Sequence, residues 1–330
     1  MIRCKSYARA GLVGNPSDGY FGKTISLIVK DYQAEVVLYE SPELEIMPNA
    51  RDHSVFDGIA KLAEDVGYFG YYGGIRLLKA TVKRFYDFCV GEGIELDERN
   101  FTIRYESNIP PQVGMAGSSA IITACLRCLM EFYGVTVPRA VQPKLILSVE
   151  NDELGIPAGL QDRVIQVFEG VVFMDFDREI MAQQGHGIYE ELNPELLPPL
   201  YVAFTTALSQ GTEVFHNDIR GRFRRGDRDV VDAMQAWAGM AQEVRDRLLA
   251  GKGDTIGGIL NQNFDLRRKL YDMSPGNIRM VEEARACGAT AKFTGSGGAI
   301  VGTYDDEAMF GKLVGRLEPL GMKVFKPTIV

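Results

Sequence analysis

One stretch, residues 109–133, constrains what this chain can fold into more than any other. It begins with two prolines, passes through small residues to Ser118 and Ser119, and then holds no glycine or proline until Gly134. The prolines end any preceding strand, and the run after Ser119 predicts a helix of about fourteen residues. A loop of small residues leading into a helix offers backbone N–H groups and the positive end of the helix dipole to an anion. The sequence predicts a phosphate-binding loop here; the alternative is a glycine–serine turn that only caps a buried helix.

The length, composition and net charge of the chain limit the classes of protein to which it can belong. Its 330 residues allow two ordinary domains, and 46% hydrophobic with 24% charged residues is typical of a soluble globular protein. A net charge of −8 argues against a general nucleic-acid binder and suits a cytosolic enzyme. No apolar run reaches the roughly 18 residues that a membrane span needs, and no secretory leader is visible. We therefore expect a cytoplasmic protein with no membrane or nucleic-acid partner.

The cysteines and histidines show no ligand spacing. The five cysteines are scattered, which fits a reducing compartment without disulfides. Cys125 and Cys128 form a CxxC inside the predicted helix, and we interpret them as buried small side chains rather than a zinc or redox site. His53, His186 and His216 lie far apart and are interpreted as surface or structural residues.

Apolar periodicity places the remaining elements. Strands are predicted over residues 2–14, 24–39, 101–106, 171–176, 201–206, 289–294, 299–304 and 322–327. Helices are predicted over residues 74–90, 143–151, 230–248, 278–285 and 306–318, with a short one before residue 171 and another beginning at 256. Residues 183–199 are rich in breaks and indicate a change of unit. The strand–helix mixture beyond them favours an α+β sandwich of the split βαβ type.

Charged residues near the loop are candidates for chemistry. Arg9 lies in a predicted strand ahead of a turn that holds Asp18, and a cation among apolar strand residues is expected to have a partner or a ligand; the alternative is a surface charge on an edge strand. Glu150 ends a predicted helix, and Asp162 follows twelve residues later. Two carboxylates near phosphates can divide the work, one holding Mg²⁺ and one orienting or deprotonating a hydroxyl. The alternatives are a solvated helix end and a helix cap.

A late glycine cluster joins two predicted strands. It runs from Gly295 to Gly298 with the sequence GSGG. A tight β turn is one interpretation, and close approach of this backbone to a ligand is the other.

Taken in order, these motifs resemble the GHMP small-molecule kinases over the full chain. They are the strand and turn with Arg9 and Asp18, the IPPQVGMAGSSA loop, the Glu150–Asp162 pair and the TGSGG turn. Two departures stand out, since the loop is one residue longer than the family's GLxSSA and GNPSD replaces the usual GEHTD. The segments GNPSDGYFGKTISL, YYGGIRLLKA, QVGMAGSSAI and AGLQDRVIQV look like the sugar-acid branch of that family.

The resemblance implies a two-domain α+β fold with a ligand cleft between the domains. The N-terminal domain, residues 1–185, is expected to be α/β and ribosomal S5 domain 2-like. The C-terminal domain, residues 186–330, is expected to be a ferredoxin-like split βαβ domain.

The resemblance also implies an ATP-dependent kinase that uses Mg²⁺. Asp162 matches the carboxylate that orients or deprotonates the acceptor hydroxyl, and Arg9 matches the residue that stabilises charge on the transferred phosphoryl group. Ser119 and Glu150 match the family's Mg²⁺ positions. The loop expected to wrap the ATP phosphates consists of Val113, Gly114, Met115, Ala116, Gly117, Ser118 and Ser119.

The resemblance to the sugar-acid branch implies phosphorylation of the anomeric hydroxyl of D-glucuronate, with Asp18 and Gly297 expected among the substrate contacts. A uronate needs a cation, for which Arg163, Arg76 and Lys23 are candidates; the alternative for Arg163 is a structural salt bridge. Galacturonate, a neutral sugar, a heptose phosphate or mevalonate are alternative acceptors. A non-catalytic sugar sensor is the alternative from another class. We expect a monomer or a homodimer.

Overall fold

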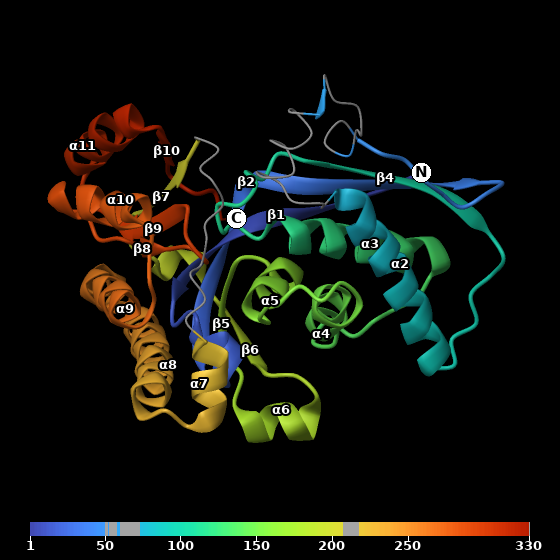
Figure 1. Ribbon diagram of the computed structural model, residues 1–330, viewed down its shortest axis with the longest axis horizontal. Coiled ribbons are helices and arrows are strands. Elements are labelled where there is room, and N and C mark those ends of the chain that lie inside the picture. Colours follow the sequence, from blue (N-terminus) through green and yellow to red (C-terminus); the bar gives the residue numbers. More distant parts are fainter. Residues whose placement is uncertain (50–51, 53–57, 60–72, 207–217, 330) are drawn as a thin grey trace. The chain divides into compact units, whose positions relative to one another are not determined.

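The computed structural model describes residues 1–329 apart from 50–51, 53–57, 60–72 and 207–217. The chain forms two compact units, each made from several segments (Figure 1). Unit 1 comprises residues 1–8, 32–109 and 116–167, and unit 2 comprises residues 9–31, 110–115 and 168–330. The first two strands, β1 (Ile2–Val13) and β2 (Lys23–Ser41), give residues to both units. The predicted domain boundary near residue 185 stays a prediction.

Unit 1 packs helices against a small sheet. The second half of β2 pairs antiparallel with β4 (Asn100–Ser107), and the short β3 (Glu45–Ile46) lies parallel to β4. Helix α2 (Gly74–Gly91) packs against α3 (Gly117–Tyr133), and both contact α4 (Gln142–Ser148) (Figure 1). Most of α3 is buried, which explains its nearly unbroken apolar sequence. A π-helical turn, Val149–Glu153, follows α4, and α5 (Gln161–Phe168) ends the unit.

Unit 2 begins with the end of β1, from Arg9, and the first half of β2. Residues Lys23–Leu27 pair antiparallel with β5 (Val171–Asp175), which pairs with β6 (Ile188–Leu192). Helices α8 (Arg228–Leu249) and α9 (Gly257–Leu270) pack together, and buried Trp237 of α8 forms an apolar cluster with α7 (Ile219–Arg225). The described part of the unit also contains a short helix, α6 (Arg178–Gln184), and the 3-10 turns Ser17–Tyr20, Pro194–Leu196, Gly253–Thr255 and Glu318–Leu320.

A second sheet in unit 2 confirms the predicted split βαβ arrangement. Its strand order is β10-β7-β9-β8, and every neighbouring pair is antiparallel. The strands are β7 (Leu200–Thr205), β8 (Lys292–Phe293), β9 (Ala299–Thr303) and β10 (Met322–Phe325). Helices α10 (Pro275–Ala286) and α11 (Glu307–Leu317) share one apolar cluster with this sheet (Figure 1). Both helices therefore bury their apolar faces against this sheet.

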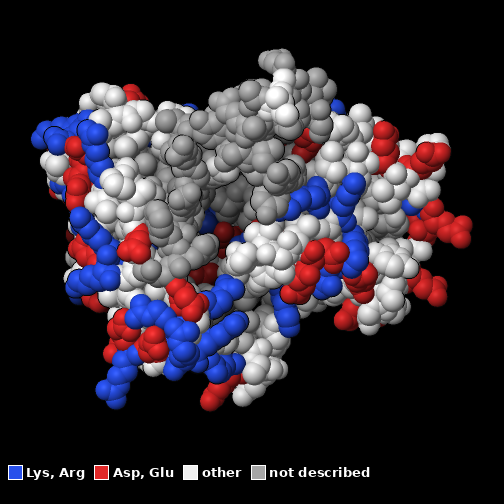
Figure 2. All heavy atoms as spheres, in the orientation of Figure 1, with Lys and Arg blue, Asp and Glu red and all other residues white. Residues whose placement is uncertain are grey.

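The structure adds elements that the sequence analysis did not predict. Residues 183–199, interpreted as a break, contain β6, an edge strand with only one buried residue, Leu192, and no clear alternation of buried and exposed side chains. Helix α7 has the arginine-rich sequence IRGRFRR and no apolar periodicity. Its arginines are balanced by acids, since Arg222 pairs with Asp227 and Asp229. Figure 2 shows basic and acidic side chains mixed over this part of unit 2.

Candidate active site

The start of α3 has the geometry of an anion site. Ala116 precedes the helix with φ +62° and ψ +45°, a left-handed conformation uncommon for a residue with a side chain. No side chain caps the helix, so the alternative interpretation, a glycine–serine turn that only caps it, is wrong. The N–H groups of the first turn are therefore not used by a cap. The predicted helix is confirmed, and it begins two residues before Ser119.

Both serines form other hydrogen bonds. Ser118 Oγ donates to Glu150 Oε1 at 2.9 Å, and Ser119 Oγ donates to the Ala116 carbonyl at 3.2 Å. The same carbonyl accepts a bond of 2.9 Å from Gln166 Nε2, which also donates to Tyr7. Gln166 of α5 is fully buried, and its Oε1 has no partner among the described residues. Its role in holding Ala116 gave no signal in the sequence.

Glu150 is only 1% exposed, so its interpretation as a solvated helix end is wrong. It lies in the π-helical turn after α4, a conformation that is frequent at functional sites. Its Oε2 accepts from Arg163 Nε at 2.9 Å and also from Arg163 Nη2. The remaining nitrogen, Nη1, donates to the Gly159 carbonyl at 2.9 Å and lies 3.4 Å from Asp162 Oδ2. The salt bridge considered as the alternative for Arg163 is therefore present.

Asp162 is the second residue of α5, one position inside the helix rather than capping it. Its side chain is 19% exposed, so its carboxylate remains reachable. Ser118, Glu150, Arg163 and Asp162 thus form one connected cluster in unit 1, which we call the carboxylate cluster. A hydroxyl and a buried carboxylate are hard oxygen donors that suit Mg²⁺, which usually takes one or two protein ligands and completes its shell with water and phosphate. Among the described residues no group of three acidic, histidine or cysteine side chains could hold a metal by itself.

Arg9 lies in unit 2 and is 4% exposed, so its interpretation as a surface charge is wrong. Its Nη1 donates to the Gly114 carbonyl at 2.5 Å and to the Thr294 carbonyl at 3.3 Å. Its backbone N–H donates to the Met115 carbonyl at 3.3 Å. Arg9 therefore ties the first part of the predicted phosphate loop to the turn before Gly295.

The glycine cluster packs against that same loop segment. A Cβ atom on Gly295 would lie 2.4 Å from the Gly114 carbonyl oxygen, and one on Gly298 would lie 2.9 Å from the Val113 Cα. Gly114 itself has φ +66°, and its Cβ would lie 2.8 Å from the Gly297 carbonyl oxygen. These glycines are required for close approach of two backbone segments. Gly117 differs, because its Cβ would meet only Ile109, at 3.5 Å.

Three further polar residues near these segments were not singled out in the sequence. Lys292 is 1% exposed and donates to the Gly11 carbonyl at 2.6 Å and to Asn15 Oδ1 at 2.5 Å. Asn263 accepts from Gly14 N–H and donates to the Asn15 carbonyl. Arg267 is 7% exposed and donates to the Gly295 carbonyl at 2.7 Å. Each is a polar residue on a helix or strand, and only the tertiary fold shows that it reaches the glycine-rich segments.

The remaining predicted residues are spread over both units. Asp18 is half-buried in the turn Ser17–Tyr20 of unit 2, and its charge acts on Arg267. Lys23 pairs with Asp175 at 2.9 Å. Arg76 lies half-buried in the first turn of α2. Gly297 has φ +141°, and its Cβ would lie 2.8 Å from Asn277 Nδ2.

Cys125 and Cys128 are buried free cysteines, as predicted. His186 contacts the Gly187 carbonyl, whereas His53 and His216 lie outside the described residues.

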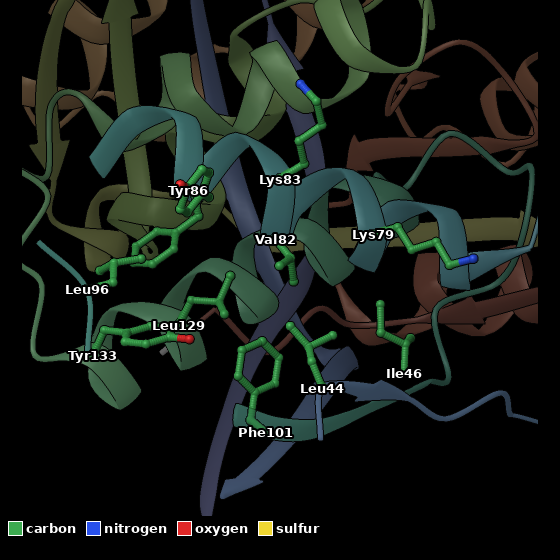
Figure 3. Close-up of a pocket in the computed structure, with 11 residues that line it drawn as sticks. Leu44, Ile46, Lys79, Val82, Lys83, Tyr86, Leu96, Phe101, Leu129 and Tyr133 are labelled. Carbon is green, nitrogen blue, oxygen red and sulfur yellow. The ribbon is translucent and has the colours of Figure 1, made fainter. Parts of the chain in front are cut away.

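A cavity of about 620 Å³ lies elsewhere in unit 1. It is lined by apolar side chains of α2, α3, β3 and β4, with Lys79 and Lys83 extending their amines away from its centre (Figure 3). None of the predicted site residues lines it. Its α3 residues, Leu129 and Tyr133, lie about 18–24 Å along the helix from Gly117 at 1.5 Å per residue, so this cavity is remote from the start of α3.

Comparison with known proteins relates this geometry to a family. Residues 76–170 match the family described as GHMP kinases N terminal domain. Glucuronokinase 1 of Arabidopsis thaliana is 44% identical over 91% of this chain and 84% of its own length, and probable glucuronokinase 2 of the same plant is 45% identical over 90% and 82%. A Lactococcus lactis galactokinase structure complexed with galactose has a TM-score of 0.78 at 17% identity, covering 99% of this chain and 93% of that one. The Methanococcus jannaschii mevalonate kinase structure has a TM-score of 0.71 at 18% identity, covering 100% and 98%.

Proposed function

Because the chain belongs to the GHMP kinase family, we propose that it is an ATP-dependent glucuronokinase. It transfers the γ-phosphoryl group of ATP to the anomeric hydroxyl of D-glucuronate, giving D-glucuronate 1-phosphate and ADP. The observation that supports glucuronate as the substrate is the 44–45% identity to plant glucuronokinases over about nine-tenths of the chain. The predicted α+β fold is confirmed by the kinases of similar structure, which at their low identity speak for the fold alone.

Phosphoryl transfer needs positioning and charge stabilisation more than covalent chemistry. Residues 113–119 supply backbone N–H groups for the ATP phosphates, supported by the left-handed Ala116 and the uncapped start of α3. Arg9 supplies a positive charge beside Gly114 of this loop for the transferred phosphoryl group. Asp162, partly exposed at the start of α5, holds the acceptor hydroxyl and takes its proton.

The metal ligands would come from the carboxylate cluster and from Ser119, the residue next to Ser118. Glu150 and Ser119 would hold Mg²⁺, as the resemblance of the motifs implies, and Ser118 is a further donor because its hydroxyl lies 2.9 Å from Glu150. When bound, the ion neutralises charge on the ATP phosphates. Arg163 fixes the Glu150 carboxylate in a buried position. We further propose a cytoplasmic protein; no described helix is long and apolar enough to span a membrane.

The proposal is tested by an acceptor screen. Purified protein with ATP and Mg²⁺ is given glucuronate, galacturonate, glucose, galactose, a heptose phosphate and mevalonate in parallel, and ADP release is measured against a blank without acceptor. We expect glucuronate to have the highest kcat/KM, with phosphorus NMR showing the phosphate on the anomeric carbon. A higher kcat/KM for another acceptor would replace the substrate, and no turnover with any acceptor would favour the sugar sensor.

A further inference from the structure

Arg267 of α9 is a buried arginine with an unused hydrogen-bonding edge. It is 7% exposed, and among the described residues its one hydrogen bond runs from Nη1 to the Gly295 carbonyl at 2.7 Å. Its guanidinium group is held over the rings of Tyr271 and Phe293, 5.3 Å and 5.5 Å from their centres. Nε and Nη2, the pair that grips a carboxylate with two parallel bonds, have no acceptor among the residues that the structure describes.

Arg163 shows how the same edge is used elsewhere in this chain. Its Nη1 also donates to a glycine carbonyl, that of Gly159, while its Nε and Nη2 hold the Glu150 carboxylate. No described acid lies within ion-pairing distance of Arg267, although it is as buried as Arg163. A buried cation that forms no ion pair is costly unless an anion joins it, so this edge is suited to an anionic ligand.

The surroundings of Arg267 favour a sugar acid as that ligand. Asp18 of the GNPSD turn lies near enough for its charge to act on Arg267, as do the hydroxyls of Tyr20 and Tyr271. A carboxylate and two phenols beside an arginine can serve the hydroxyls and the acid group of one small molecule. Arg267 also touches Gly295, the glycine that packs on Gly114, so this cluster adjoins the loop segment predicted to hold phosphate.

We propose that Arg267 binds the carboxylate of the acceptor through Nε and Nη2 and thereby sets the preference for a uronate over a neutral sugar. This rests on the proposed glucuronokinase function. Two of the three cations predicted from the sequence for this task, Lys23 and Arg163, are already paired with acids of the chain. Arg267 has the geometry that the task needs, and it serves as a substrate-binding residue rather than as a group that moves protons.

The experiment compares Arg267→Met with wild type on glucuronate, its neutral amide glucuronamide, and glucose. Arg268→Met is the matched control, because Arg268 is the next residue of α9 but is half-exposed and paired with Glu282 at 2.8 Å. We expect Arg267→Met to lower kcat/KM for glucuronate by roughly ten- to a hundred-fold. The values for glucuronamide and glucose, and the KM for ATP, should stay within about threefold of wild type, since none of them uses the carboxylate contact. The control should match wild type on all of them.

Each outcome decides between distinct conclusions. An equal fall for glucuronate and glucuronamide would overturn the proposal and make Arg267 only a support for the glycine turn. If Arg267→Met does not fold, Arg267→Lys decides, because it keeps the charge but loses the two-pronged grip. A fall in the glucuronate-to-glucuronamide ratio then supports the proposal, and an unchanged ratio overturns it. A wild-type enzyme that does not prefer glucuronate to glucose overturns the proposed substrate itself before any variant is compared.

Discussion

Arg163 in unit 1 and Arg267 in unit 2 are two buried arginines with opposite surroundings. Both donate from Nη1 to a glycine carbonyl, at 2.9 Å for Gly159 and 2.7 Å for Gly295. Arg163 completes its hydrogen bonds with Glu150, whereas the same edge of Arg267 meets no acid in the described part of the chain. Among the residues that the structure describes, the first arginine forms an ion pair with an acid and the second does not.

This difference separates a residue that builds the site from one that is available to a ligand. Breaking a buried ion pair leaves an uncompensated charge, so Arg163 is needed to keep Glu150 in place. A buried arginine held by a carbonyl and two rings keeps a fixed orientation, and burial lowers its pKa because the charged form loses hydration. An anionic ligand would reverse that penalty. The comparison therefore assigns a structural role to Arg163 and a recognition role to Arg267.

The largest expected effect concerns whether the carboxylate cluster does chemistry at all. Asp162→Asn should lower kcat by about 10²–10⁴-fold, because an amide can neither take the proton nor hold the hydroxyl as an anion does. ATP affinity should be little changed, since Asp162 is not a phosphate ligand in the proposal. Steady-state kinetics and ATP titration of the same preparation measure both quantities.

Asp152→Asn is the control for this prediction, because Asp152 is an exposed acid in the neighbouring π-helical turn. It should retain wild-type kcat. If Asp162→Asn also stayed within threefold of wild type, Asp162 would be only the outer partner of Arg163, and the cluster would be a structural salt bridge.

The second prediction tests the comparison through stability. Arg163→Met should reduce the free energy of unfolding by about 3–5 kcal/mol, because Glu150 stays buried without its partner. Arg267→Met should cost less, about 1–2 kcal/mol, because it strands only the Gly295 carbonyl. Urea denaturation of the two variants without ligands gives both values.

The double variant Arg163→Met with Glu150→Gln supplies the check, because it removes both buried charges and should recover part of the loss. Equal losses for the two single variants would contradict the comparison. They would mean that Arg267 has a counter-charge outside the described residues.

Much of the loop and helix framework could be predicted from the sequence, because it depends on local patterns. Helix α3 was predicted from the proline pair, the small residues and the apolar run that follows them. The glycine cluster predicted the turn between β8 and β9. The sequence placed Glu150 and Asp162 near each other, and it offered a salt bridge to a nearby acid only as the alternative for Arg163, which the structure shows to link the two. Local patterns failed for α7 and β6, since neither has a buried face with regular spacing.

The partners of polar side chains could not be predicted, because they depend on which segments the fold brings together. Arg267 is one of two adjacent arginines in α9, and the sequence does not show that one is buried and the other half-exposed. Gln166 and Asn263 are ordinary amides until the fold places them against Ala116 and Gly14. The glycine cluster connects the antiparallel strands β8 and β9, as the turn interpretation expected, but the sequence did not show that its backbone also packs against Gly114.

The smallest effect concerns Lys292, a second cation of unit 2 without an acidic partner among the described residues. Burial, helped by the charges of Arg267 and Arg9, holds the pKa of Lys292 well below its ordinary value of 10.5. Its two oxygen acceptors, on Gly11 and Asn15, match the two N–H groups of a neutral amine. Between the lowered pKa and 10.5, Lys292 carries a proton in the unfolded chain but not in the folded one. The free energy of unfolding therefore rises with pH across that window, and Lys292 has no effect on its pH dependence above 10.5.

The stability difference between wild type and Lys292→Met should therefore grow in favour of wild type from pH 7 to 9.5, by at most about 1.4 kcal/mol per pH unit. Urea titrations at several pH values measure it, with Lys269→Met, which removes an exposed lysine of α9, as the control whose difference from wild type should not grow. A difference that is flat for both variants would show that Lys292 stays charged when buried, and that unit 2 tolerates unpaired cations without the help of a ligand.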